Sequence, residues 1–425
     1  MRPYLGGAFL LWIGIWLGIN TGPWRLRFIP TGLLSWVHLL RTLFPLVALP
    51  VCGILASGLR NTSREPLPRA LRFWTGYGVI GLAAGLIWPA SLVRGSLMDP
   101  AYWAVAYLSV IACAWACLQG GDALTNAIRL NRLSWLVAMA FLVSMVIAAR
   151  GAIFKGSGLD ATGYGVMENV GSVADVPVSR STGVARFFAV PAILCFILSW
   201  RRSGWEKGLW AAAALVCGGM VYVMQSRGSI IGLGAAVGFS LLFLGHRARF
   251  VGVVLLVIIL LALALEMVPP QVVAHLTQKY ATARAGILSG RTRAWSSAVT
   301  VIQHSPVWGW GMQADREFVH EHAHNTYLYG LLTSGIAGGT LFVLGLVHAW
   351  RQLIRLIRNP WTERLGQGTT LRQAGALLAF FTARGLAEVS GTVFGIDYMM
   401  MAAAIAYLGV LERRVGLAVR AEEHA

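Results

Sequence analysis

The sequence predicts an all-α polytopic integral membrane protein, and two features of its composition support that prediction. The 425-residue chain is 57% hydrophobic, and only 12% of its residues are charged. A soluble domain of this size has about 25% charged residues, so too few polar side chains remain to cover a water-soluble globule. The chain also contains 17 Trp and 49 Gly, which are typical of membrane interfaces and of closely packed membrane helices.

Apolar segments of spanning length recur along the chain. A helix needs about 20 apolar residues to cross a bilayer, and we identify about twelve such segments. The candidate spans are residues 4–21, 36–58, 73–93, 101–119, 134–150, 185–200, 208–225, 229–245, 250–268, 325–349, 373–388 and 396–412. No small-residue cleavage site is evident after the first span, so we expect it to be retained. Together they predict a single membrane domain over residues 1–425.

The basic residues predict the orientation of these spans. Short loops around Arg69, Arg129 and Arg355 are rich in arginine, and such loops remain in the cytoplasm. Both termini are then expected to be cytoplasmic. The opposite side carries two long loops, residues 151–184 and 269–324, which we expect in the periplasm. Cytoplasmic loops account for much of the net charge of +18, so no nucleic-acid partner is expected.

Several arginines nevertheless lie on the side where that rule disfavours them. Arg227, within Gln225-Ser226-Arg227-Gly228-Ser229, joins two spans with almost no loop and falls at the outer boundary. A charge there usually faces a cavity or a partner, although a snorkelling side chain is the structural alternative. Arg180, Arg186, Arg291 and Arg293 fall in or beside the two long loops. Because a guanidinium matches phosphate oxygens, phosphate is the ligand we expect.

Three alternating histidines, His320, His322 and His324, lie where the second long loop meets an apolar span. An extended segment would point all three to one side, as zinc ligands could be, but no nearby fourth ligand stands out. They could also be histidines merely tolerated at an interface. We favour one histidine as a general base, because histidine titrates near neutral pH.

Carboxylates are informative mainly by their rarity. No Asp-x-Asp occurs in the chain, so a metal-bound nucleotide-sugar site is not indicated, and we expect neither metal nor cofactor. Glu388 falls within a candidate span, where an acid is a functional candidate by default. Pairing with Arg384, four residues earlier, is an equally good structural account. Gly330, Gly335, Gly338 and Gly339 have small-residue spacing with Ser334, which predicts close helix packing.

Three segments together resemble the O-antigen ligase family. His324-Asn325, nine residues, Gly335, two residues and Gly338 are similar to the family pattern H-[NSQ]-x9-G-x2-[GTY]. Ser305-Pro306-Val307-Trp308-Gly309-Trp310-Gly311 resembles the P-x-x-G-x-G segment of the family's large loop. Gln225-Ser226-Arg227-Gly228 resembles its Ser-Arg-Gly element. The similarity covers roughly residues 140–400 and is fairly specific for the ligase and polymerase superfamily.

The resemblance implies a GT-C-like, inverting glycosyltransferase in the bacterial inner membrane, with its active site facing the periplasm. The donor would be O-antigen on undecaprenyl diphosphate, and the acceptor a sugar of the lipid A core oligosaccharide. His324 would be the catalytic base. The other implied site residues are Arg227, Arg180, Arg186 and Arg291 for the diphosphate, with Asn325, Glu388 and Arg293 in support.

Three alternatives remain open. An O-antigen polymerase would use the same donor with a second lipid-linked glycan as acceptor. A protein O-oligosaccharyltransferase usually carries more sequence after the histidine than this chain does. A transporter of the lipid-linked glycan would use arginines in a central cavity but would not need a loop histidine.

Overall fold

The computed structural model describes most of the chain in nine stretches. They are residues 3–19, 33–58, 65–87, 98–155, 181–224, 226–243, 252–253, 291–320 and 322–424. Every regular element in these stretches is helical, so the all-α prediction is confirmed there. The candidate span at 250–268 lies almost entirely outside the described residues, as does most of the first long loop.

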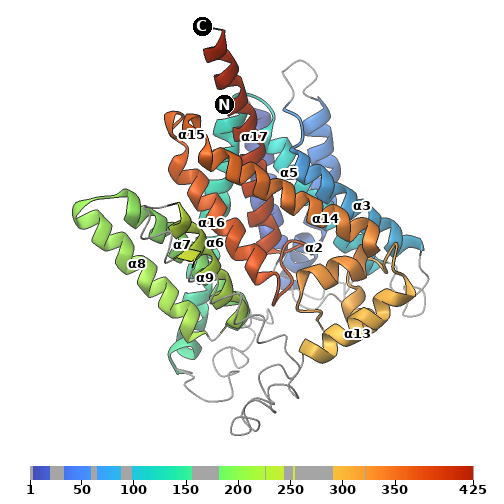
Figure 1. The fold of residues 1–425 in the computed structure, drawn as a ribbon. Coiled ribbons are helices and arrows are strands. Elements are labelled where there is room, and N and C mark those ends of the chain that lie inside the picture. Colours follow the sequence, from blue (N-terminus) through green and yellow to red (C-terminus); the bar gives the residue numbers. More distant parts are fainter. Residues whose placement is uncertain are drawn as a thin grey trace.

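The described helices follow the order of the candidate spans (Figure 1). They are α1 Pro3–Ile19, α2 Leu33–Gly58, α3 Arg69–Ile87, α5 Met98–Leu118, α6 Ala123–Lys155, α7 Ser181–Arg201, α8 Gly204–Val223, α9 Arg227–Leu242, α13 Arg291–His304, the short π-helix η1 Asp315–Val319, α14 Thr326–Arg358, α15 Pro360–Arg364, α16 Gly368–Arg384 and α17 Ile396–Glu423. Helix α13 and η1 lie inside the second long loop predicted from the sequence.

Five helices in the described part of the chain are long and apolar enough to cross a membrane. They are Arg69–Ile87, Pro100–Leu118, Ala123–Ser144, Gly183–Arg201 and Thr326–Arg358. Shorter apolar helices occur at Gly6–Trp16, Leu43–Leu55 and Gly228–Leu242. These helices are consistent with a membrane protein. The larger figure of about twelve spans, based on apolar length alone, stays a prediction.

Helix α17 lies at the centre of the bundle. Its residues from Ile396 to Leu411 are all buried, and it contacts α3, α5, α6, α14 and α16. A helix buried on every side must be apolar or small on every side, and this helix is rich in Ala and Met at these positions. Aromatic rings fix its start, where Tyr398 stacks on Tyr107 with ring centroids 4.0 Å apart.

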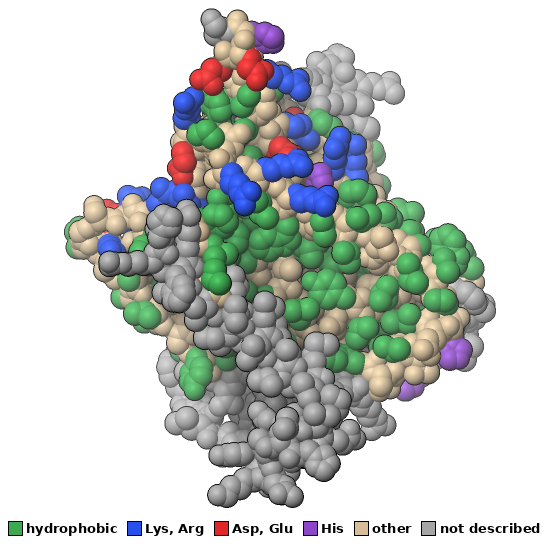
Figure 2. Space-filling view, in the orientation of Figure 1, with side chains coloured by type: hydrophobic (Ala, Val, Ile, Leu, Met, Phe, Trp, Pro, Cys, Tyr) green, Lys and Arg blue, Asp and Glu red, His purple; other side chains and the backbone are tan. Residues whose placement is uncertain are grey.

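Basic side chains gather at one end of the molecule. Figure 2 shows Lys and Arg around α15 and the last turns of α17, next to a broad apolar surface. Glu363 in α15 joins two of these arginines, Arg201 at 2.8 Å and Arg372 at 2.9 Å. Helix α13 lies at the other end (Figure 1). This separation is the pattern expected of a protein whose basic loops are cytoplasmic.

Helix α14 is interrupted at Ser334 and Gly335, and the chain at 305–311 fills the break. Gly335 has φ +58°, and a Cβ there would come within 2.2 Å of the Val307 carbonyl group. Trp310 N–H donates to the Leu332 carbonyl at 2.9 Å, and Ile336 N–H donates to the Pro306 carbonyl at 2.8 Å. The sequence interpretation of Gly335 as a helix-packing residue is therefore wrong. Gly335 is required because the backbone turns and a loop lies directly against it.

Candidate active site

His324 directly precedes the capping residue of α14, in an uncommon backbone conformation. Its φ is +44°, a region that few residues other than glycine adopt. The Nδ1 atom of His324 lies 3.2 Å from Oε2 of Glu388. The imidazole side chain is 34% exposed, and the glutamate side chain is 14% exposed. The ring is thus held on one side and accessible on another.

The start of α14 is tied to the loop between α16 and α17. Asn325 caps the helix by accepting hydrogen bonds from the backbone N–H groups of Tyr327 and Leu328, at 2.9 and 3.0 Å. Its side-chain amide also donates to the Leu386 carbonyl at 3.1 Å. Thr326 N–H donates to the Gly385 carbonyl at 2.8 Å. These bonds fix the residue that follows His324 relative to the loop that carries Glu388.

Two predictions about Glu388 need correction. Helix α16 ends at Arg384, so Glu388 lies in the loop after the helix and not inside a span. Arg384 does not pair with Glu388 as the i, i+4 spacing suggested. Its Nη1 donates instead to Ser390 Oγ, at 2.9 Å, and to a carboxylate oxygen of Asp397. The backbone N–H of Glu388 still donates to the Arg384 carbonyl at 2.9 Å, whereas its carboxylate contacts His324.

The other two histidines have different surroundings. Asp315 is buried, and its carboxylate accepts from the backbone N–H of Arg316 at 2.9 Å and of Ala323 at 3.2 Å. His322 Nδ1 lies 3.5 Å from the same carboxylate, while its Nε2 lies 3.1 Å from an Arg316 nitrogen. His320 is exposed.

The geometry removes the basis for a zinc site built from these histidines. His320 has φ +59° and His324 has φ +44°, so the segment is not the extended strand that would align three rings. The part of the chain that the structure describes contains no group of three or more His, Cys, Asp or Glu arranged to hold a metal ion.

A buried ionic cluster lies behind the His324–Glu388 pair. Arg186 of α7 and Arg384 of α16 both contact Asp397, the second residue of α17. Arg186 is one of the site residues predicted from the sequence, whereas Asp397 is not. The signal was present, because an acid at the start of an apolar helix is a functional candidate for the same reason as Glu388.

The remaining predicted arginines can be placed only in part. Arg227 is the first residue of α9, and a Cβ on its neighbour Gly228 would lie 3.0 Å from Cγ of Glu388. The start of α9 therefore abuts the Glu388 loop. Arg291 and Arg293 belong to the first turn of α13. Arg180 lies outside the described residues, as do the side chains of the other three.

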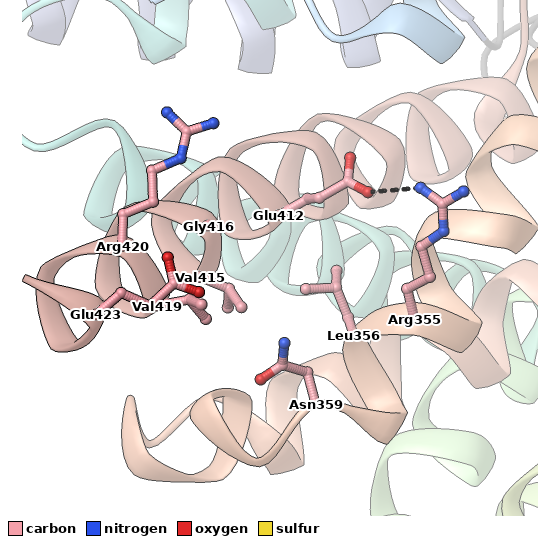
Figure 3. A pocket seen from close by; sticks show the side chains of 9 residues that line it. All are labelled: Arg355, Leu356, Asn359, Glu412, Val415, Gly416, Val419, Arg420 and Glu423. Carbon is pink, nitrogen blue, oxygen red and sulfur yellow. Dashed lines mark ion pairs between the residues drawn. The ribbon is translucent and has the colours of Figure 1, made fainter.

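A separate groove lies at the opposite end of α14. It has a volume of about 380 Å³ and is lined by residues of α14 and α17, among them Arg355, Glu412 and Arg420. Figure 3 shows Arg355 and Glu412 pointing toward each other across it. The part of α14 between its break at Gly335 and Arg355 is about 20 residues, roughly 30 Å at 1.5 Å each, so the groove lies far from the end that begins beside His324. The groove is therefore not part of the histidine site.

Comparison with known proteins bears on the same region. No curated protein matched the chain. Residues 211–343 match the family model described as O-antigen ligase. This segment contains Arg227, Arg291, His324 and the broken part of α14, whereas Arg186, Glu388 and Asp397 fall outside it. Residues 211–343 of the chain are thus similar to the O-antigen ligase family.

Proposed function

We propose that the protein is an inverting glycosyltransferase that moves O-antigen from undecaprenyl diphosphate to a sugar of the lipid A core. One observation carries the proposal: a partly exposed histidine, His324, contacts a carboxylate at 3.2 Å where the ends of several helices meet. Arg186 comes to that junction from α7 and Arg227 begins α9 there. A base beside several cations is the arrangement needed to activate a hydroxyl and to receive a diphosphate leaving group.

Glu388 prepares the histidine for proton transfer. An ionised carboxylate can only accept hydrogen bonds, so the proton of the neutral imidazole resides on Nδ1. Nε2 is then free to accept the proton of the acceptor sugar hydroxyl. The hydroxyl oxygen attacks the anomeric carbon as the bond to the diphosphate oxygen breaks. The electron pair leaves with the diphosphate, and the anomeric configuration inverts.

Cations at the site would stabilise the charge that develops on the leaving diphosphate. Arg227 lies in the first turn of a helix, where the helix dipole also favours an anion. Arg186, Arg180 and Arg291 complete the proposed diphosphate site. Arginine is suited to this task because its planar fork of donors matches phosphate oxygens. The proposal needs no metal or cofactor for this step.

The position of the site fits a reaction at the periplasmic face of the inner membrane. The basic end of the molecule lies away from α13 (Figures 1 and 2). Since basic short loops remain in the cytoplasm, the end that carries His324 faces the periplasm and both termini face the cytoplasm. Undecaprenyl-linked glycan would then reach the site from the outer leaflet.

Replacing His324 tests this function directly. We expect His324→Asn to abolish transfer of lipid-linked O-antigen in purified membranes, because the amide cannot act as the base. Asparagine tolerates positive φ, so the backbone should be retained. His320→Asn is the matched control, since His320 also has positive φ but is exposed and lies outside the proposed chemistry. Transfer at the wild-type rate by His324→Asn at equal protein levels would refute the general-base role.

The lipopolysaccharide of a deletion strain separates the ligase from the polymerase. Loss of a ligase leaves core-only lipopolysaccharide while full-length glycan accumulates on its lipid carrier. Loss of a polymerase leaves core bearing a single repeat unit. A transporter is separated by the histidine variant, because export of the glycan would survive the loss of a base.

A further inference from the structure

Asp397 uses both of its carboxylate oxygens inside the protein. Oδ1 lies 3.3 Å from Nη1 of Arg186. Oδ2 accepts from Ser390 Oγ at 2.7 Å and from Arg384. The aspartate side chain is 3% exposed. A buried carboxylate is stable only when paired and hydrogen-bonded, and here two arginines from two different helices fulfil that requirement.

The two arginines differ in access to a ligand. The Arg384 side chain is 4% exposed, whereas that of Arg186 is 20% exposed. Arg384 therefore contacts only the protein interior, whereas part of the Arg186 side chain is accessible to a ligand. Two guanidinium groups on one carboxylate leave the cluster with a net positive charge. Among the described residues, the buried Nε atoms of both arginines have no hydrogen-bond partner, and Asp397 contacts both arginines through their outer nitrogens.

The cluster is also linked to the His324 segment. Ser390 Oγ contacts both Arg384 and Asp397, and Ser390 N–H donates to Thr326 Oγ1 at 2.6 Å. Thr326 Oγ1 in turn donates to the Glu388 carbonyl at 3.0 Å. A displacement of Asp397 would therefore move its direct partner Arg186. It would also move the loop that carries Glu388, because Ser390 links that loop to Asp397.

We propose that Asp397 is a positioning residue, which holds Arg186 so that its accessible face binds the diphosphate of the lipid-linked donor. The inference rests on the proposed function, because it takes the diphosphate as the ligand of Arg186. It adds a residue outside the segment matched by the family. Arg384 and Ser390 are the anchors that keep the aspartate in place.

Binding of undecaprenyl diphosphate to the detergent-solubilised full-length protein tests the inference without requiring transfer. We expect Asp397→Asn to raise the Kd at least about tenfold, the effect of losing one charge-assisted hydrogen bond. The KM for the donor should rise with it, while kcat at saturating donor changes little. Glu412→Gln is the matched control, because Glu412 also contacts an arginine, Arg355, but at the opposite end of α14. Unchanged or tighter binding by Asp397→Asn would contradict the inference.

A double variant separates positioning from charge. Asp397→Asn with Arg384→Met removes one negative and one positive charge, so the net charge of the cluster stays as in the wild type. We expect the raised Kd to persist, because Arg186 has still lost its partner. A return to the wild-type Kd would mean that Asp397 only neutralises Arg384. In an Arg186→Ala background, Asp397→Asn should cause no further change in Kd, since the effect passes through Arg186.

Gel filtration and a conservative substitution serve as controls for correct folding of the variant. If Asp397→Asn does not elute as a single species, Asp397→Glu keeps the charge and shifts the carboxylate by one methylene group. It should still raise the Kd, and an unchanged Kd would contradict the inference. Failure of the wild type to bind undecaprenyl diphosphate would instead contradict the proposed function. If the wild type binds undecaprenyl diphosphate and His324→Asn still catalyses transfer, the general-base role of His324 is contradicted. The inferred role of Asp397 in binding is not affected by that result.

Discussion

At the scale of single residues, the site depends on contacts that restrict a side chain. His324 is oriented by Glu388 on one nitrogen, and its backbone is fixed by the capping bonds of the next residue, Asn325. Both contacts come before any substrate binds. A preorganised base contributes to rate because no further ordering is needed in the transition state.

We therefore expect Glu388→Gln to reduce kcat by about 10²-fold or more, the range for a misplaced general base, with little change in the donor KM. Glutamine can present its N–H₂ group to the imidazole, which would favour the wrong tautomer. Steady-state kinetics with purified donor would measure both constants. Glu363→Gln is the control, because Glu363 binds arginines at the basic end. A rise in KM alone would assign Glu388 to binding and not to orientation of the base.

At the scale of elements, the break in α14 joins two motifs that are separate in the sequence. The segment 305–311 lies against Gly335, and Gly309 with φ +71° lies against the backbone of Thr333 to Gly335. This packing holds the chain that follows α13 and leads toward the histidines. A loop that replaces helical hydrogen bonds satisfies the backbone groups that the break would otherwise leave unpaired.

Gly335→Ala should therefore destabilise the protein by about 1–3 kcal/mol from backbone strain alone, before the steric clash is considered. The thermal midpoint of the purified protein in detergent is the measurement, read together with donor transfer. Gly416→Ala in α17 is the control, because no atom lies within 4 Å of a Cβ at that position. Equal midpoints for the two variants would show that the break tolerates a side chain.

The sequence predicts the helices of this protein better than it predicts the contacts between them. The spans at 185–200 and 325–349 coincide with α7 and α14, because apolar length is a local property. His324 and Asn325 could be found from a local pattern. The pairing of Asp397 with Arg186 and Arg384 could not, since these partners lie on α7 and α16 and the contacts depend on tertiary packing. Gly335 was assigned to helix packing because a break in an apolar helix has no signal until the inserted loop is seen.

At the scale of the whole molecule, the two ends of α14 have different surroundings. One end begins beside His324, and the other ends among basic residues near α15 (Figure 1). After its break at Gly335, α14 continues to Arg358, and these residues span roughly 35 Å, which exceeds the hydrocarbon core of about 30 Å. The proposed topology puts a bilayer between these ends. A reagent that cannot cross the membrane should then reach each end from a different side.

Cysteine labelling measures that accessibility. His320→Cys and Arg358→Cys introduce thiols at exposed positions near either end of α14, in a background where the five native cysteines, buried or partly buried, are replaced by alanine. A membrane-impermeant maleimide should label the first variant in right-side-out spheroplasts and the second only in inside-out vesicles, because the proposed topology puts the histidine end in the periplasm. Both should react once detergent opens the membrane. The reverse pattern would place His324 in the cytoplasm, where an outer-leaflet donor could not reach it.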